Sequence, residues 1–234
     1  AVGKVEGVVR IDALTHQAEL LALPASLKGG ASILWPTAVG LGPKGTILVG
    51  SGEGTFKLDK ATRKYKPLLM VNGDPLKVIS NGSGFVADST RQGLWIGTPH
   101  HGLVFYSAND DRLFDGEKDR GLSPLLNEKL TSVCVDPGGG IWAADNHKDE
   151  IVHWDKSTGA ITRTHHLPGL PDTKVGDMMY MGMDRQGVLW GCSWDHGGFR
   201  FDPRDGTSSW FHVHDNRPGA LPFGYIRDAL DMPD

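Results

Sequence analysis

The histidines of this chain are the residues whose types and positions could do chemistry. His100 and His101 are adjacent, and His147, Asp195 and His196 follow later in the sequence. Imidazole and carboxylate groups suit a divalent transition metal, and a His–Asp pair suits general acid–base catalysis. No HExxH pair or other fixed ligand spacing is present, and adjacent residues at a strand-like tip point apart. We therefore expect no metal site and no cofactor, and interpret these side chains as ligand contacts or solvated tips.

The motifs of other common enzymes are missing from the sequence. It contains no GxSxG nucleophile elbow and no Walker loop. The glycine-rich run GSGEG (50–54) is not followed by a helical pattern, so it does not form a phosphate cradle. These absences favour a binding protein over an enzyme.

The composition excludes two classes of partner. The net charge is −4, the isoelectric point is about 6.2 and no cluster of Lys and Arg occurs, which argues against binding to nucleic acid or to an anionic membrane. No apolar run approaches the roughly 20 residues that span a bilayer, so we expect no membrane insertion of this segment. The two cysteines, Cys134 and Cys192, lack metal-ligand spacing and are expected to be free buried thiols.

A repeat of about 47 residues organises the chain. A motif of glycine, apolar residues and tryptophan recurs, and its tryptophan position steps by 47, 47 and 48 residues through Leu48, Trp95, Trp142 and Trp190. The motif is read at GTILVG (45–50), GLWIG (93–97), GGIWAA (139–144) and GVLWGC (187–192). A fixed period of this length is typical of folds that are built from structural repeats.

A second column with the same period follows each motif after a short polar tip. It is read at VVRID (8–12), TFKLD (55–59), LVFYS (103–107), IVHWD (151–155) and GFRFD (198–202). Apolar and polar residues alternate within it, which predicts a strand with one buried face. Short strands before the motif and after the column bring each repeat to four antiparallel strands. We therefore predict an all-β fold, a β-propeller of about five repeats.

The two ends of the chain are cut in the same register within the repeat. The first residues match the end of a second strand, and residues 225–234 match a first strand and its turn. One blade can thus be completed by pairing the C-terminal strand with the N-terminal half blade, which would remove exposed sheet edges. Residues 1–234 then form a single propeller domain. The alternative is a fragment of a larger propeller.

The propeller fold gathers the candidate site residues on one face. The tips between second and third strands and the connectors between blades emerge there, around one mouth of the central channel, and loops on a rigid scaffold commonly carry binding residues. Trp35 and Trp194 break the periodic columns and are candidates for stacking on a sugar or another flat ligand. The predicted ligand-binding residues are Trp35, His100, His101, His147, Trp194, Asp195, His196 and Tyr225.

Other aromatic and histidine residues are expected to be structural. Trp95, Trp142 and Trp190 recur with the blade period, which favours packing between neighbouring blades over ligand stacking. His153 occupies the polar position of its strand and is predicted to be a half-exposed strand residue.

The repeats resemble a known family. GLWIGTPHHGLVFY (93–106) and WFHVHDNRPGALPFGYIRDAL (210–230) are similar to the two-component regulator propeller repeats of bacterial sensor proteins. The resemblance implies the periplasmic or extracytoplasmic sensor region of a histidine kinase or related regulator, recognising an oligosaccharide or another small extracellular ligand. The full-length protein would then carry a transmembrane segment elsewhere.

One repeat supports an alternative function. IWAADNHKDEIVHWDKSTG (141–159) resembles the blades of streptogramin-lyase-like propellers. This resemblance implies a lyase or hydrolase acting on a polysaccharide or a cyclic peptide ester, with a histidine base and a divalent metal. Fold alone does not choose between a sensor and an enzyme.

Overall fold

The computed structural model describes most of the strands and the short turns that join them. The described residues are 7–22, 36–51, 54–70, 73, 76, 84–98, 101–115, 130–145, 150–155, 157–164, 178–193 and 197–211.

The described residues form four four-stranded antiparallel sheets and one two-stranded sheet. We call the four-stranded sheets blades I to IV in chain order and the two-stranded sheet, β1 (Gly7–Ile11) and β2 (Ala18–Ala22), the half blade. Blade I contains β3 (Pro36–Leu41), β4 (Ile47–Ser51), β5 (Gly54–Asp59) and β6 (Lys64–Leu68). Blade II contains β7 (Phe85–Asp88), β8 (Gly93–Thr98), β9 (Gly102–Ser107) and β10 (Arg112–Asp115).

Blades III and IV repeat the same order of strands. Blade III contains β11 (Leu130–Val135), β12 (Ile141–Asp145), β13 (Glu150–Trp154) and β14 (Ile161–Thr164). Blade IV contains β15 (Met178–Met183), β16 (Leu189–Ser193), β17 (Gly198–Asp202) and β18 (Thr207–Phe211). Each strand pairs with its sequence neighbour, as the repeat predicted.

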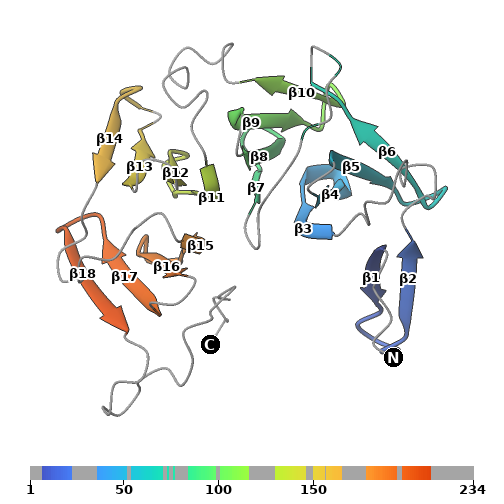
Figure 1. Ribbon diagram of the computed structural model, residues 1–234, viewed down its shortest axis with the longest axis horizontal. Helices are drawn as coiled ribbons and strands as arrows, with labels where there is room; N and C mark the ends of the chain where they lie inside the picture. The colour runs from blue at the N-terminus through green and yellow to red at the C-terminus, as the bar shows by residue number, and fades with distance from the viewer. Residues whose placement is uncertain are drawn as a thin grey trace.

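The blades are arranged around a common centre, which confirms the predicted propeller-like fold. Figure 1 shows the first strand of each blade, β3, β7, β11 and β15, nearest the centre, and the fourth strands at the periphery. The first strands of neighbouring blades contact one another, β3 with β7, β7 with β11 and β11 with β15. The half blade, whose strands correspond to the third and fourth strands of a blade, lies next to blade I (Figure 1).

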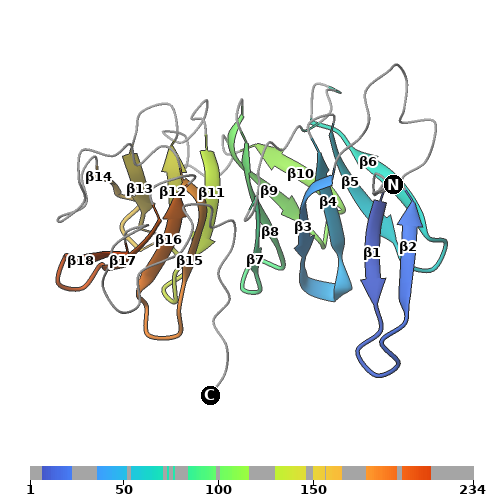
Figure 2. The same cartoon turned by 60° about the horizontal axis from the view of Figure 1, so that its bottom comes forward.

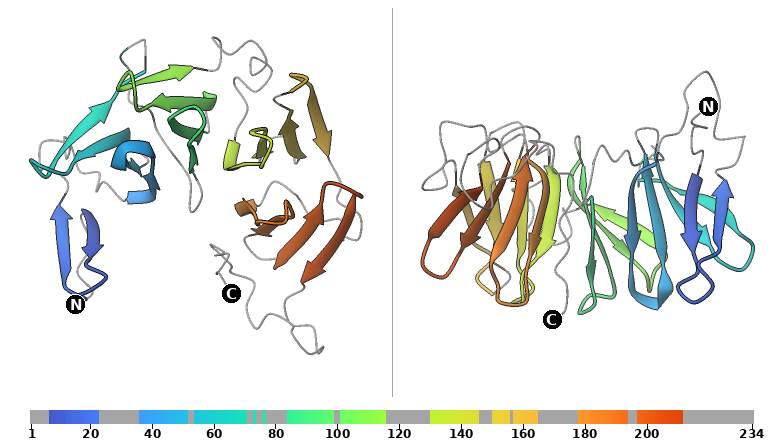
Figure 3. Two further views of the ribbon diagram at one scale, coloured as in Figure 1. Left: turned by 180° about the vertical axis from the view of Figure 1, so that it is seen from behind. Right: turned by 90° about the horizontal axis from the view of Figure 1, so that it is seen from below.

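The described sheets form an open arc rather than a closed ring (Figure 3). The expected pairing of residues 225–234 with the half blade lies outside the described residues. At the half-blade end of the arc Val9, Ile11 and Leu20 are 47%, 66% and 55% exposed. In the other blades the position of Val9 is covered by the preceding blade, so that Val104 and Val152 are fully buried.

The strands of the blades are buried on both faces because each blade is sandwiched between neighbours. Every residue of β8 is buried, and its side chains alternate between blades I and III. Leu94 and Ile96 pack with Leu48 of blade I, whereas Trp95 packs with Val133 of blade III. Strands buried on both faces read as continuous apolar runs, which explains the run Leu94–Ile96 in the sequence.

The hydrophobic core is therefore divided among the interfaces between blades. Trp95 is 1% exposed in the cluster between blades II and III, and Trp142 is 7% exposed in the cluster between blades III and IV. The predicted packing of these two tryptophans between blades is confirmed. The blades approach closely at Gly97, where an added Cβ would lie 2.9 Å from Cγ2 of Val133.

The arc has two distinct faces. Figure 2 shows the turns between first and second strands and between third and fourth strands on the same, lower side, which we call the turn face. The antiparallel order places the turns between second and third strands at the opposite end of each blade, which we call the tip face. The ligand contacts were predicted for the tip face, and His101, at the turn between β8 and β9, lies there.

Candidate functional site

The tip between β8 and β9 carries His101, the predicted site residue that the structure describes. The hydroxyl of Thr98 accepts a hydrogen bond from the His101 backbone N–H at 2.9 Å and donates to the Gly102 carbonyl at 3.0 Å. Thr98 is fully buried and His101 is half-buried. The backbone of the tip is thus fixed by the buried Thr98 side chain. Because these bonds involve only backbone atoms of His101 and Gly102, a substitution of the imidazole leaves them intact.

The tip of blade I is closed in the same way. Ser51, one repeat before Thr98, donates from its hydroxyl to the Gly54 carbonyl at 2.9 Å and accepts from the Gly54 N–H at 3.2 Å. In blade III the corresponding residue is Asp145, which pairs across the sheet with Glu150, and both are buried. This column of short polar side chains was not predicted from the sequence, although it recurs with the period of about 47 residues.

The remaining predicted contacts lie outside the described residues. They are Trp35, His100, His147, Trp194, Asp195, His196 and Tyr225. The assignment of a ligand site to the tip face therefore stays a prediction, with His101 as its described member.

The turn face contains a recurring bond between aspartate and tryptophan. In blade II the Trp95 indole N–H donates to Asp88 at 3.0 Å, and in blade IV the Trp190 indole donates to Asp184 at 2.7 Å. Arg91 also pairs with Asp88 at 2.8 Å, and its guanidinium lies 5.1 Å from the centre of the Trp95 ring. Trp95 and Trp190 thus join the second strand of their blades to the turn that follows the first strand.

Hydrogen bonds hold the pKa of these two carboxyls low. Burial raises the pKa of Asp88, but the bonds from Arg91 and from Trp95 outweigh it and leave the pKa below the ordinary value. Burial likewise opposes the bonds from Trp190 and the turn amides at Asp184, and again the pKa is lowered. These aspartates are ionised turn-forming residues and are poor candidates for a general acid.

Blade III replaces the indole donor with a histidine. Nε2 of His153 lies 2.9 Å from Oδ2 of Asp136, and the imidazole stacks on Trp142 with ring centres 4.1 Å apart. His153 is a partly exposed strand residue, as predicted. It stacks on Trp142 because the two residues are directly paired across β12 and β13, and from there its imidazole reaches Asp136 in the turn. Blade I has neither the aspartate nor the tryptophan, since Gly42 occupies the aspartate position and Leu48 the tryptophan position.

Both cysteines are buried and neither takes part in a disulfide, as predicted. Burial raises the pKa of the Cys134 thiol strongly, so this group is unreactive as a nucleophile. Among the described residues no group of three or more His, Cys, Asp or Glu side chains could hold a metal ion. No helix in the described ranges is long and apolar enough to cross a membrane.

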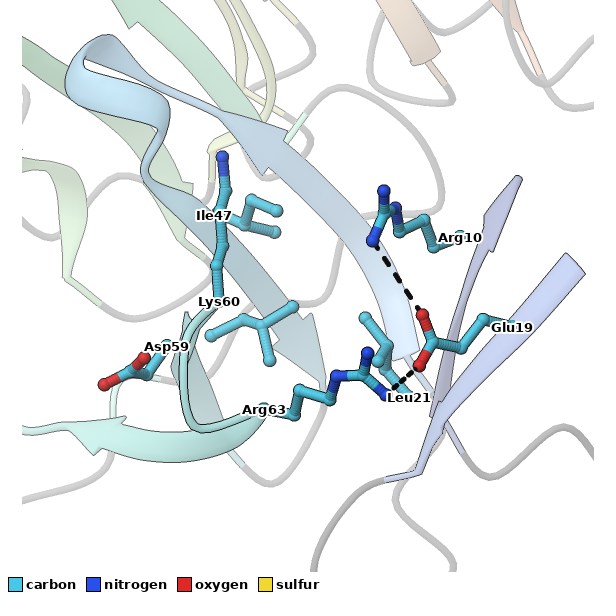
Figure 4. Close-up of a pocket in the computed structure, with 8 residues that line it drawn as sticks. Arg10, Glu19, Leu21, Ile47, Asp59, Lys60 and Arg63 are labelled. Atoms are coloured by element: carbon cyan, nitrogen blue, oxygen red, sulfur yellow. Dashed lines mark hydrogen bonds and ion pairs between the residues drawn. The ribbon is translucent and has the colours of Figure 1, made fainter. Parts of the chain in front are cut away.

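A cavity that sequence analysis missed lies between the half blade and blade I (Figure 4). Its volume is about 340 Å³, and its lining includes Asp59 at the end of β5 and Lys60 and Arg63 of the turn between β5 and β6. Cations, carboxylates and apolar side chains line it together: Arg10, Glu19, Leu21, Ile47, Leu58, Asp59, Lys60 and Arg63. The cavity lies between two sheets, so the alternation of residues along one strand could not predict it.

No known protein family and no curated protein matches the sequence. Solved structures do match in fold. The extracellular domain of a putative hybrid two-component system protein from B. thetaiotaomicron matches with a TM-score of 0.55 and 15% identity, over 81% of this chain and 23% of that chain. A second structure of the extracellular domain of the same protein, there described as a putative one-component system, gives a TM-score of 0.58 at 15% identity, over 96% of this chain and 35% of that chain.

A lyase is also similar in structure. Virginiamycin B lyase from Staphylococcus aureus matches with a TM-score of 0.64 and 14% identity, over 91% of this chain and 64% of the lyase. The chain therefore spans less than two thirds of the length of each of these structures. At these identities the similarity establishes a propeller-like fold, and fold does not decide between binding and catalysis.

Proposed function

We propose that this chain is the ligand-binding propeller region of a sensor in a bacterial two-component signalling protein, and that it works outside the cytoplasm. The observation that carries the proposal is the arc of four-stranded blades, because the extracellular domain of a bacterial signalling protein shares this fold in two solved structures. The repeats at 93–106 and 210–230, which resemble sensor propeller repeats, support the same assignment.

The proposed ligand is an oligosaccharide or another small extracellular molecule, bound at the tip face. His101 is held there by the buried Thr98, so its imidazole is displayed on a rigid backbone. A rigid display of this kind lowers the entropy lost on binding. The predicted aromatic residues Trp35 and Trp194 would supply the flat surfaces on which sugar rings stack.

Calorimetric titration against a panel of neutral oligosaccharides tests the proposal. His101→Ala should weaken binding by about tenfold, because it removes one hydrogen-bonding side chain and leaves the Thr98 bonds intact. His16→Asn is the matched control: His16 is exposed on the turn face with a φ of 57°, which asparagine tolerates. Equal loss in both variants, or no binding of any glycan, would contradict the proposal.

A lyase is the second candidate function. The similarity to the S. aureus lyase favours it, and a variant of that lyase with histidine replaced by alanine is catalytically inactive. In this chain His147 and His196 would be the candidate bases, and a divalent metal would assist them. Cleavage of a polysaccharide or a streptogramin by the purified protein, lost on His147→Ala or His196→Ala, would replace the sensor assignment with this one.

A further inference from the structure

The two interfaces that flank blade I use the same strand positions with different residues. Between blades I and II, Lys57 of β5 contacts Asp111 of the next blade at 2.6 Å, and Lys66 of β6 contacts it at 3.5 Å. The Tyr106 hydroxyl donates to the same carboxylate at 2.7 Å. Two cations and one phenol thus converge on one carboxylate, and Tyr106 is fully buried.

At the interface between the half blade and blade I, two of the three charged positions have the opposite sign. Arg10 stands where Lys57 stands one repeat later, Glu19 where Lys66 stands, and Arg63 where Asp111 stands. The turn positions of Arg63 and Asp111 have the same left-handed backbone, with φ of 56° and 54°. Glu19 forms an ion pair with Arg63 and a looser one with Arg10 at 3.9 Å, so again two cations share one carboxylate.

One large side chain that fills the interface between blades I and II is missing beside the cavity. Leu58 occupies the position of Tyr106, so the phenol ring and hydroxyl that fill the space between blades I and II have no counterpart here. Leu58 itself is buried, at 4% exposure, and forms the wall with Leu21 and Ile47. The space is therefore lined on one side by apolar side chains.

An additional cation stands at the edge of this space. Lys60 occupies the position of Ala108, and its amino group lies over Gly45, where an added Cβ would be only 2.7 Å from Nζ. In the described part of the chain Lys60 forms no ion pair. Figure 4 shows Lys60 and Arg10 on the two sides of Ile47, with Asp59 pointing away from Glu19.

The carboxylate of Asp59 is already used by its own turn. It accepts hydrogen bonds from the backbone N–H groups of Ala61 at 2.9 Å and Thr62 at 3.0 Å. These bonds, that from Thr62 first, hold its pKa below the ordinary value. Glu19 is paired with Arg10 and Arg63, and the three cations Arg10, Lys60 and Arg63 outnumber the two carboxylates of the lining, so the cavity carries a small excess of positive charge.

We propose that this cavity is a second binding site, which takes a small organic carboxylate whose body has an apolar face, such as a single uronic acid residue. The carboxylate binds between Arg10 and Lys60, and the apolar face of the ring packs on Ile47, Leu21 and Leu58. A volume of about 340 Å³ lies at the lower end of the range of small-molecule sites. The site is at the opposite end of the blades from His101 and stands independently of the proposed sensor function.

NMR titration of the ¹⁵N-labelled chain with galacturonate tests the proposal directly. We expect shifts confined to residues around 10–21, 47 and 58–63 and a dissociation constant of about 1 mM, as suits a ligand of this size. Galactose has the same ring without the charge, and acetate has the charge without the ring. Each should bind about tenfold more weakly. Equal binding of acetate or galactose would overturn the proposal.

Substitutions separate the site from a diffuse surface effect. Arg10→Gln and Lys60→Gln should each weaken galacturonate binding by about tenfold, since each removes a charged hydrogen-bond donor. Lys57→Gln is the matched control, because Lys57 holds the position of Arg10 at the filled interface and should leave binding unchanged. Similar losses in Lys57→Gln and Arg10→Gln would contradict a defined site.

Filling the cavity provides a test that does not depend on charge. Leu58→Tyr places at this interface the residue that blade II already accommodates at Tyr106, and it should abolish the galacturonate shifts while the rest of the spectrum is retained. Retained binding in a folded Leu58→Tyr protein would overturn the proposal. His101→Ala should not affect these shifts, so failure of the tip-face site and failure of the cavity site are distinguishable.

Discussion

The two interfaces on either side of blade I differ in several buried residues, and the exchange of Tyr106 for Leu58 is the difference that lies at the cavity. Tyr106 fills the space between blades I and II and donates to Asp111. Leu58, at the same position one repeat earlier, lines a cavity of about 340 Å³. The turns that carry Arg63 and Asp111 have the same left-handed backbone conformation at the two interfaces.

This contrast teaches that the repeat specifies the strands, while the residues at a few positions specify what each interface does. The interface of blades I and II is stabilised by a buried ring and a carboxylate shared by Lys57 and Lys66. The interface of the half blade and blade I exposes its charged groups to a space that a ligand can enter. The proposed cavity site therefore uses an interface whose packing is incomplete.

The largest expected effect comes from converting the filled interface into the open one. Tyr106→Leu should lower the free energy of unfolding by about 2–3 kcal/mol, because it removes buried ring contacts and the bond to Asp111. Urea denaturation measures the change. The control Tyr106→Phe keeps the ring and should lose only about 1 kcal/mol. Equal stability of Tyr106→Leu and the wild type would show that the ring does not hold this interface.

A smaller effect is expected at the carboxylate that Lys57 and Lys66 share. Asp111→Asn should lower the free energy of unfolding by about 0.5–1 kcal/mol, a modest value because the Asp111 side chain is 43% exposed and solvent screens its charge. Urea denaturation at neutral pH checks this magnitude. No loss of stability would show that the ion pairs contribute nothing here.

The same variant makes a prediction about pH. Burial raises the pKa of Asp111, but the bonds from Lys57 and Tyr106 outweigh it, and the folded pKa lies below the ordinary value of 3.8. A depressed carboxyl pKa contributes stability above the unfolded value, and this contribution is lost as the pH falls through the folded value. The difference between wild type and Asp111→Asn should thus shrink below about pH 4. A difference that grows on acidification would contradict the assignment.

The smallest effect is expected at the open interface. Glu19→Gln should change the free energy of unfolding by no more than about 0.5 kcal/mol, because Arg10 and Arg63 are 63% and 65% exposed and such pairs contribute little. Thermal unfolding checks the value. A loss comparable to that of Tyr106→Leu would mean that the half blade is docked by its charges, and would remove the contrast between the two interfaces.

Most of the described fold could be predicted from the sequence, because strand formation depends on local alternation and the repeat supplies it several times. The expected strand 198–202 is observed as β17, and the expected strand 103–107 is observed as β9 with one added residue. Closure of the arc by residues 225–234 depends on contacts between the ends of the chain. It stays a prediction, since those residues are outside the described ranges.

The sites were less accessible from sequence because they depend on side chains that meet across sheets. Leu58 and Tyr106 occupy equivalent positions on the face of the third strand that was predicted to be buried. The cavity beside Leu58 depends on the packing of the neighbouring sheet, which the sequence pattern does not show. The bonds of Trp95 to Asp88 and of His153 to Asp136 likewise join residues on different strands. For the tip face, His101 is the predicted contact that can be placed, and its role stays a prediction.

Equilibrium dialysis against a mixture of neutral and acidic oligosaccharides, followed by mass spectrometry of the retained and free sugars, tests the central claim most directly. A ligand-binding sensor propeller should retain a subset of the sugars in stoichiometric amount and with unchanged masses. Failure to retain any sugar, or the appearance of shorter chains with an unsaturated end, would contradict the account.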